Sequence, residues 1–498
     1  MANEYILSID AGTTGIKVSI FDNRALVVSN ASEEFTQYTP SSEKVEHDAN
    51  EIWYKTLTLM KKALQQANIK ASDIASIGIT NQRTTIVVWD KHTGEPIHHA
   101  IVWQDQRTAD EAEFYKEKWG EKNYKTTGLV FGAVNSTLFI KWILDHVPGA
   151  KEKAASHQLL VGTIDTWLTW KLTKGKVHAV SYSNASATSA FDITNLCWYK
   201  EWLNELDIPV ELFPEVRDDL GNYGATDPSL FGEEISINAL IADQHAAMFA
   251  QNCREAGHVK CTHGTGSFLD VNIGDTPVFP GNSMNTILGW KIGNEIRYAM
   301  EGYVSVTGAA VQWLRDGAKL IENAEQTEEL ALSVEDNGGV YFVPALAGLS
   351  APYWDSHARG MIIGIHRGTQ HGHLIRATLE GIVYSIKDFL DTISRDAKVQ
   401  IQSVKVDGGG AKNNFMMQFQ ADMLHSEVVR PLNTDATILG AAFMAGLATG
   451  FWENVDECYA TQKIDKVFQP LIEKEGVDKY YERWCKAVSK TRDWMHVS

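Results

Sequence analysis

The hydrophobic and polar positions near the N-terminus predict a two-stranded hairpin over Ile6–Asp22. Apolar residues lead up to Asp10, a Gly-Thr-Thr-Gly turn follows at 12–15, and Ile16, Val18 and Ile20 then alternate with polar residues. Alternation of this kind is typical of a half-buried strand, and a glycine turn between two such runs is typical of a hairpin. We therefore expect two strands, with an acid at the end of the first.

This opening turn has two interpretations. Gly12 and Gly15 can adopt positive φ and let a ligand approach the backbone. Main-chain N–H groups and the hydroxyls of Thr13 and Thr14 could then donate to phosphate oxygens, with Asp10 placed to hold a metal ion. The alternative is an ordinary hairpin whose turn favours glycine.

The same design returns later in the chain. Residues 259–275 read as a strand, a Gly-Thr-Gly turn and a second strand, which indicates a weak internal duplication into two lobes. A third glycine turn, Asp407–Gly410, follows a strand at 404–406 and leads into a helix capped by Asn413 or Asn414. A helix N-terminus behind a glycine turn can bind an anion.

Three other buried runs end in polar clusters. Strands predicted at 74–80, 100–103 and 239–242 lead into Asn81–Thr84, Gln104–Arg107 and Asp243–His245. Ligands of open α/β sheets bind beyond the carboxyl ends of the strands. For Gln106 and Arg107 a capped loop start is the preferred interpretation. Helical spacing predicts helices at 50–67 and 374–393.

Composition narrows the function classes. The 498 residues suffice for two to four domains, and the net charge of −18 argues against nucleic acid as a partner. Tryptophans between residues 124 and 202 lack interleaved basic residues, so core packing is expected rather than base stacking. The five scattered cysteines form no CxxC pair. No signal-peptide pattern and no 20-residue apolar run occur, so we expect a soluble cytoplasmic protein without membrane contact.

The usual nucleotide and hydrolase motifs are missing. GxxxxGK[ST], a strand-borne GxGxxG, HExxH and GxSxG are all absent, which disfavours P-loop and Rossmann folds and these hydrolases. His366, His371 and His373 lie close together in sequence, and a solvated helix start is preferred to a metal site there.

An ordered set of motifs resembles the FGGY carbohydrate kinases, in particular glycerol kinases. These motifs are Ser8–Thr14, Thr80–Arg83, Val102–Gln104, Ala242–Gln244, Gly264–Phe268, Ala351–Asp355 and Asp407–Gly409, together with a second family signature from Gly360 to Glu380. The resemblance implies an α/β, two-lobed actin/Hsp70-type (ribonuclease H-like) sugar-kinase fold with ligands in the interlobe cleft. It implies a substrate-side lobe at 1–246, a nucleotide-side lobe at 247–498, and either a homodimer or a homotetramer.

The resemblance also implies a reaction and its residues. The reaction is ATP- and Mg²⁺-dependent phosphorylation of a hydroxyl of glycerol or a related small polyol, giving glycerol 3-phosphate or an analogous sugar or polyol phosphate. Asp243 is implied as general base, with Asp10 and Asp243 on the metal side. The implied nucleotide contacts are Thr13, Thr14, Thr265, Gly308, Gln312, Gly409, Gly410 and Asn413. The implied polyol site comprises Arg83, Thr84, Trp103, Asn135, Asp243, Gln244 and Phe268. The alternative for Asp243 is a helix cap or an interlobe salt bridge.

The chain departs from the glycerol kinase pattern in the substrate pocket. Thr84 stands where glycerol kinases have Glu, and Val134 or Asn135 where they have Tyr. Phe139, His245 and His263 also stand where the family usually has other residues. Other segments of the chain resemble the divergent glycerol kinase 5-like branch. A hydroxyl-binding site weakens when its polar partners are lost, so we expect poor glycerol use. The alternatives are a kinase of another polyol or ketose and a nucleotide-binding pseudokinase.

Overall fold

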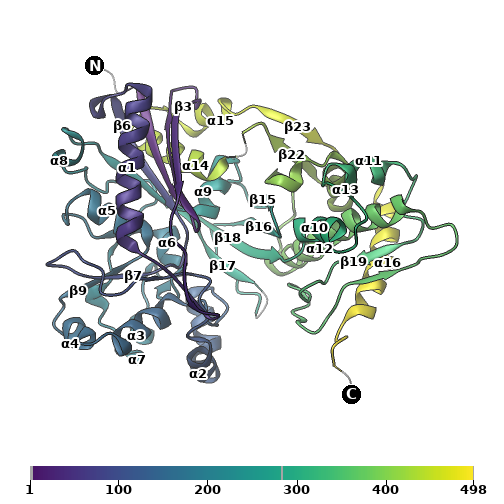
Figure 1. Ribbon diagram of the computed structural model, residues 1–498, viewed down its shortest axis with the longest axis horizontal. Coiled ribbons are helices and arrows are strands. Elements are labelled where there is room, and N and C mark those ends of the chain that lie inside the picture. Colours follow the sequence, from purple (N-terminus) through teal and green to yellow (C-terminus); the bar gives the residue numbers. More distant parts are fainter. Residues whose placement is uncertain (1–3, 282–283, 434, 497–498) are drawn as a thin grey trace.

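Two lobes, each built on one β-sheet, form the molecule (Figure 1). A computed structural model describes residues 4–281, 284–433 and 435–496. In the first sheet β1 pairs antiparallel with β2 and parallel with β6, which confirms the opening hairpin. The strands in sheet order are β14 (Ile237–Ala242), β6 (Ile74–Asn81), β1 (Tyr5–Ala11), β2 (Gly15–Phe21) and β3 (Val27–Glu34).

The second sheet repeats this topology. An antiparallel set is again followed by two strands that run parallel to its first strand, as β15, β16 and β18 are followed by β21 and β22. The predicted internal duplication is therefore confirmed. The strands in sheet order are β17 (Asn285–Ile292), β18 (Glu295–Val304), β16 (Ser267–Gly274), β15 (His258–His263), β21 (Ser403–Asp407), β22 (Glu427–Pro431) and β23 (Ile464–Phe468).

Helices cover both faces of the first sheet. The helix predicted at 50–67 is α1 (Ala49–Ala67), which begins where the Asp48 carboxylate accepts a hydrogen bond from the N–H of Asn50. Alternation along β1 sends Leu7 and Ile9 into the core that α1 shares with α5 (Ile164–Leu172). Ser8, on the opposite face, donates to the carbonyl of Ile438 in α14 (Ala436–Thr449).

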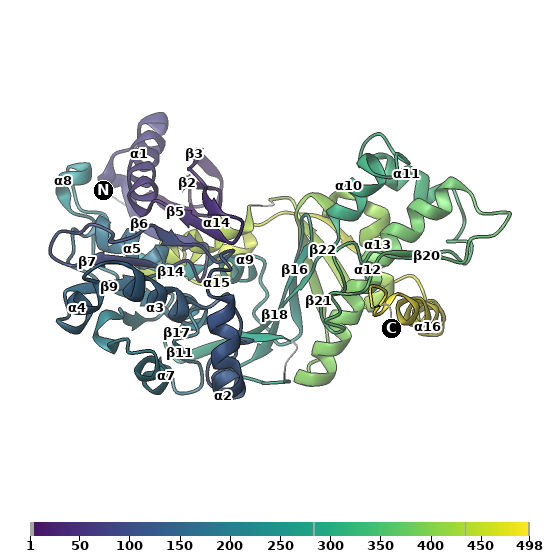
Figure 2. The same cartoon turned by 60° about the horizontal axis from the view of Figure 1, so that its bottom comes forward.

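Two equivalent helices meet at the seam between the lobes. Helix α9 (Asp243–Ala250) follows β14 as α14 follows β22, and Figure 2 shows both beside the first sheet. A Cβ on Gly440 would lie 1.9 Å from the carbonyl oxygen of Ala246, so α14 and α9 approach at backbone contact. A helix from the C-terminal half thus packs against the N-terminal sheet. The predicted boundary between residues 246 and 247 stays a prediction.

Several smaller predictions are confirmed. Trp167 and Trp202 are fully buried in the cores of the first lobe. Arg107 forms ion pairs with Asp105 and Glu46, so this strand end is structural. The second long helix, α12 (His371–Ala397), begins three residues earlier than predicted, at an exposed histidine.

The remaining elements complete the lobes. No helix in the described parts of the chain has both the length and the apolar character needed to cross a membrane. The remaining helices are α2 (Ala109–Thr127), α3 (Ser136–His146), α4 (Ala150–Ala155), α6 (Tyr182–Ser186), α7 (Lys200–Glu205), α8 (Pro228–Phe231), α10 (Gly308–Asp316), α11 (Gln326–Leu332), α13 (Asn414–Leu424), α15 (Val455–Ala460) and α16 (Lys474–Thr491), with 3₁₀ turns η1 (Ala71–Asp73), η2 (Val210–Leu212) and η3 (Gly409–Lys412). The remaining strands are β4 (Tyr38–Ser41), β5 (Lys44–His47), β7 (Val87–Asp90), β8 (Ala100–Ile101), β9 (Leu159–Gly162), β10 (Ala179–Ser181), β11 (Phe191–Asp192), β12 (Cys197–Trp198), β13 (Glu215–Arg217), β19 (Tyr341–Val343) and β20 (Met361–Ile363).

Candidate active site

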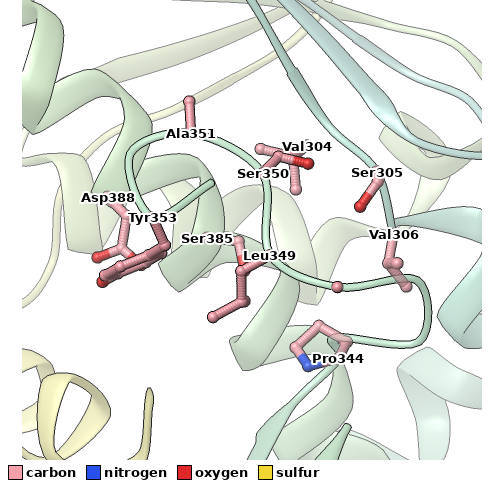
Figure 3. A pocket seen from close by; sticks show the side chains of 11 residues that line it. Val304, Ser305, Val306, Pro344, Leu349, Ser350, Ala351, Tyr353, Ser385 and Asp388 are labelled. Atoms are coloured by element: carbon pink, nitrogen blue, oxygen red, sulfur yellow. The ribbon is translucent and has the colours of Figure 1, made fainter. Parts of the chain in front are cut away.

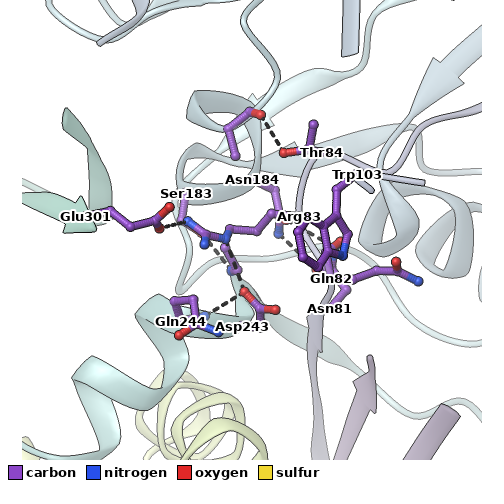
Figure 4. A network of polar contacts seen from close by, with 12 residues as sticks. Asn81, Gln82, Arg83, Thr84, Trp103, Ser183, Asn184, Asp243, Gln244 and Glu301 are labelled. Carbon is purple, nitrogen blue, oxygen red and sulfur yellow. Dashed lines mark hydrogen bonds and ion pairs between the residues drawn. The ribbon is translucent and has the colours of Figure 1, made fainter. Parts of the chain in front are cut away.

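Two predicted site residues meet where parallel strands of the first sheet end. Ala242 at the end of β14 is in register with Asn81 at the end of β6. The residues that follow are therefore neighbours, and Arg83 Nε lies 3.1 Å from Oδ1 of Asp243 (Figure 4). The Asp243 side chain remains 25% exposed. A partly exposed carboxylate at a strand end can meet a ligand, as the sequence predicted.

Arg83 also reaches across the seam. Its Nη1 pairs with Glu301 of β18, so one guanidinium joins carboxylates from the two lobes (Figure 4). Burial alone would lower the pKa of Arg83, but Glu301, Asp243 and Asp270 raise it above its ordinary value. Arg83 therefore stays charged, and its other N–H groups can bind oxygen atoms of a ligand.

Asp10 and Asp243 form an acidic pair at the ends of β1 and β14. Burial, and next the charge of Asp243, raise the pKa of Asp10 to about 7. Burial likewise raises the pKa of Asp243, while Arg83 opposes the shift. Two mutually repelling carboxylates are oxygen ligands of the kind that Mg²⁺ prefers. These residues thus fit a divalent cation.

Two side chains, Trp103 and Gln82, form hydrogen bonds with the opening turn. Trp103 donates its indole N–H to the Thr13 hydroxyl at 3.0 Å, and the Gln82 amide donates to the Gly12 carbonyl at 3.1 Å. Neither turn glycine adopts the positive φ considered from the sequence. Gly15 is instead required by packing, because a Cβ there would lie 2.8 Å from the Glu33 carbonyl oxygen. Close strand packing, rather than ligand approach, explains this glycine.

The second glycine turn borders a large cavity in the C-terminal lobe. The cavity has a volume of about 1070 Å³, with apolar walls from Leu379, Ile382 and Met416 beside charged and hydroxyl side chains. Such a mixture suits a planar base at one end and phosphates at the other. Six of the eight predicted nucleotide contacts line it: Thr265, Gly308, Gln312, Gly409, Gly410 and Asn413. Thr13 and Thr14 belong to the opening turn and are outside this lining.

The third glycine turn opens a helix, as predicted, but a 3₁₀ turn intervenes. Gly408 has φ of 83°, η3 follows, and Asn413 then caps α13 by accepting from the N–H of Met416 at 2.8 Å. The Asn413 amide also donates to Thr327. Its side chain therefore already has partners on the cavity wall.

The other predicted polyol residues occupy different settings. Thr84 has φ of 67°, and its hydroxyl donates to the Ala187 carbonyl at 3.0 Å. Asn135 caps α3 and is only 1% exposed, whereas Val134 is 43% exposed. Gln244 accepts from Lys260, and Phe268 lies against Tyr303 with ring centroids 4.5 Å apart. Asn135 thus has a structural use that the sequence pattern did not indicate.

Comparison with known proteins settles the family. The model of the N-terminal domain of the FGGY family of carbohydrate kinases matches residues 5–250, and that of the C-terminal domain matches residues 259–449. The chain belongs to the FGGY family of carbohydrate kinases. The glycerol kinase of Petrotoga mobilis is 48% identical over 99% of both chains, and glycerol kinase 2 of Thermotoga maritima is 47% identical over 99% of both.

Solved structures of FGGY relatives agree with the two-lobed fold. The Plasmodium falciparum glycerol kinase with ADP superposes with a TM-score of 0.94 at 31% identity, covering 98% of both chains. The xylulose kinase of Lactobacillus acidophilus superposes with a TM-score of 0.86 at 20% identity over 98% of both chains, which shows the fold alone. The predicted sugar-kinase fold is confirmed.

Sequence reasoning missed three charged residues of this FGGY site. Lys260, Asp270 and Glu301 lie in one row across β15, β16 and β18, each in register with the next. A signal was present, because Asp270 interrupts the apolar run Phe268–Val271 and Lys260 stands between Val259 and Cys261. A charge inside a buried strand calls for a partner.

A second, smaller cavity lies in the C-terminal lobe beside the buried carboxylate of Asp388. It measures about 30 Å³, and Ser305, Ser350, Tyr353 and Asp388 are among its lining residues (Figure 3). The Asp388 carboxylate accepts from Tyr481 and from Trp484 at 2.5 and 2.8 Å. The space suits a single water and not a polyol.

Proposed function

We propose that the chain transfers the γ-phosphoryl group of ATP to a hydroxyl of glycerol or a related small polyol. The product is glycerol 3-phosphate or the analogous polyol phosphate. The observation that carries this proposal is the pairing of Asp243 with Arg83 at the lobe seam, in a chain whose second lobe holds a nucleotide-sized cavity. The relatives that are 47–48% identical are glycerol kinases, which supports the same reaction.

In this proposal Asp243 is the general base. Its carboxylate accepts the proton of the attacking hydroxyl as the phosphoryl group moves, and Arg83 keeps it oriented through the 3.1 Å contact. Trp103 and Phe268 supply the walls against which the carbon chain of the polyol lies. Phosphoryl transfer otherwise requires positioning and charge neutralisation.

The cavity in the C-terminal lobe takes the nucleotide in this scheme. Thr265, Gly308 and Gly409 offer backbone and hydroxyl groups to the phosphates, and Thr13 and Thr14 face them from the opening turn. Asp10 and Asp243 would hold Mg²⁺, which when bound neutralises phosphate charge.

The identity of the polyol is the open part of the proposal. The names of the relatives favour glycerol, whereas Thr84 removes the carboxylate that glycerol kinases present to the substrate hydroxyls. Another polyol or a ketose is thus the alternative within the same chemistry. A pseudokinase is disfavoured by the presence of Asp243, which such a protein would be expected to have lost.

The proposed location of the enzyme is the cytoplasm. A cytoplasmic protein that binds neither membrane nor nucleic acid accords with the net charge of −18. The proposed assembly is a homodimer or a homotetramer.

A phosphorylation screen tests the proposed function. Purified protein is incubated with ATP and Mg²⁺ and with glycerol, dihydroxyacetone, four- and five-carbon polyols, ketopentoses or inositols, and ADP release is measured together with the phosphorylated product. We expect turnover with at least one polyol and none without Mg²⁺. ATP binding without any transfer would favour the pseudokinase.

A further inference from the structure

His245, Asp270 and Glu301 form a cluster of polar side chains, here called the chamber, next to Arg83, which pairs with both Asp243 and Glu301. His245 lies in α9, two residues after Asp243, and faces Asp270 of β16 and Glu301 of β18. The side-chain nitrogen and oxygen atoms of the three residues lie within 4.8 Å of one another. His245 and Asp270 are fully buried. The chamber is therefore formed by both lobes, with the histidine from one and the carboxylates from the other.

Three polar atoms in this chamber have no partner. Both ring nitrogens of His245 and Oδ1 of Asp270 make no hydrogen bond within the described residues. An unsatisfied buried polar group destabilises the folded protein. One oxygen atom that forms hydrogen bonds of about 2.8 Å can bridge groups separated by such a gap. The chamber thus has the polarity and the spacing to receive a hydroxyl group.

The charges in the chamber favour a neutral guest. Lys260 contacts Oδ2 of Asp270 at 3.2 Å, and Arg83 forms an ion pair with Glu301. Both carboxylates therefore already have a cationic partner. A divalent metal would have to displace these cations, which is costly in a buried setting. Both ring nitrogens of His245 are without a hydrogen-bond partner within the described residues, and a neutral imidazole offers one donor and one acceptor, which matches a hydroxyl.

The chamber adjoins the proposed polyol site. Phe268 and Asp270 are two residues apart on β16 and share one face of the strand, so they are separated by about 6.8 Å. Their cross-strand partners on β18 are Tyr303 and Glu301. Glu301 binds Arg83 and therefore belongs to both spaces. Moving along the strands from Phe268 towards Asp270 leads from the polyol wall into the chamber.

We propose that His245, Asp270 and Glu301 form a second hydroxyl-binding subsite, which receives the distal hydroxyl of a polyol with four or more carbons. The inference rests on the proposed function, since it assigns the substrate class of that same site. The reacting hydroxyl lies at Asp243, and Arg83 binds the middle of the chain. The distal hydroxyl donates its proton to Asp270 and accepts a hydrogen bond from a ring N–H of His245.

The experiment compares polyols of different length on matched variants. Turnover of glycerol, erythritol, D-threitol, ribitol and xylitol is measured for the wild type, His245→Leu and Asp270→Asn. We expect at least one longer polyol to exceed glycerol in kcat/KM. Each variant should lower the ratio of kcat/KM for that polyol to kcat/KM for glycerol at least tenfold, because a buried hydrogen bond is lost. Met248→Leu, a conservative buried change further along α9, is the control and should keep the ratio.

Binding without ATP separates this inference from the proposed function. The same polyols are titrated calorimetrically into each folded protein, and a tenfold weaker affinity of His245→Leu for the longer polyol supports the subsite even if no turnover occurs. Turnover of the wild type with unchanged ratios in both variants would overturn the subsite while leaving the kinase proposal intact. Tightly held, chelator-removable zinc in the wild type that is absent from His245→Leu would also overturn it, in favour of a metal site.

Discussion

Arg83 and Asp243 lie 3.1 Å apart at adjoining strand ends of the first sheet, so the proposed base has a fixed cationic neighbour. The arginine favours the ionised form of Asp243, although burial raises the net pKa of the carboxyl. A base that is held in place by an ion pair needs no rearrangement before it accepts a proton. This relationship leads to the first prediction.

Asp243→Asn keeps the shape of the side chain and its contact with Arg83 but removes the proton acceptor. Turnover should fall by about 10²–10⁴-fold, the usual contribution of a general base. ATP affinity, measured by calorimetry, should change little. Near-wild-type turnover would show that Asp243 has only a structural role, as the ion-pair partner of Arg83.

Replacement of Asp10 by Ala should weaken metal-dependent transfer, and Thr14→Val should weaken phosphate contacts. Both effects appear as higher Mg²⁺ and ATP concentrations at half-maximal rate. Asp22→Asn is the matched control, because within the described residues the carboxylate of this acid on the same hairpin accepts hydrogen bonds only from Arg24 and Leu26. If Asp10→Ala and Thr14→Val lose their fold and show no specific ATP defect, the turn is an ordinary hairpin.

Thr84→Glu should lower the KM for glycerol at the expense of longer polyols. A carboxylate at this position can accept charge-assisted hydrogen bonds of roughly 1.5–3 kcal/mol. Thr84 uses its hydroxyl on the Ala187 carbonyl instead. Thr84→Ser retains that hydroxyl and serves as the control in steady-state kinetics. A wild type that already uses glycerol best of all, at low KM, would refute this pocket argument.

Asp165→Asn should change how stability depends on pH. Burial raises the pKa of Asp165 to about 6, and its Oδ2 has no hydrogen-bond partner in the described part of the chain. Between pH 4 and pH 6 the folded wild type binds more protons than the unfolded chain, so its stability falls as pH rises. By pH 7 this loss, absent from the variant, should reach about 3 kcal/mol. Urea midpoints of both proteins at pH 4.5 and 7 measure it, and parallel midpoints would contradict it.

Gly440→Ala should disturb the contact between α14 and α9. The new Cβ would lie 1.9 Å from the Ala246 carbonyl oxygen, so backbone must move. We expect a loss of stability of about 1–3 kcal/mol, as for other overpacked sites, and reduced turnover because α9 carries Asp243. Gly132→Ala, where a Cβ meets nothing within 4 Å, is the control. Equal melting temperatures for the two variants would contradict the close packing.

The sequence alone determined the elements with strong local signals. The opening hairpin, helix α1 and the second glycine hairpin follow from period-two and period-3.6 patterns and from turn chemistry, which depend on near neighbours. Asp243 and the polar cluster that contains Arg83 were found for the same reason, since both come at the end of a buried strand, and the resemblance then implied their roles. The ordered motifs then indicated the FGGY family.

The tertiary structure alone decided which distant residues share a site. Glu301 is 218 positions from Arg83, and their ion pair depends on how β18 meets the end of β6 across the lobes. Asn135 has a polar side chain that could bind a polyol hydroxyl, yet it serves as a helix cap because α3 begins there. His245 and Asp270 reveal unpartnered atoms only once α9 is packed on the second sheet. Local pattern fixes strands and turns, whereas these pairings depend on packing between lobes, which no short stretch of sequence encodes.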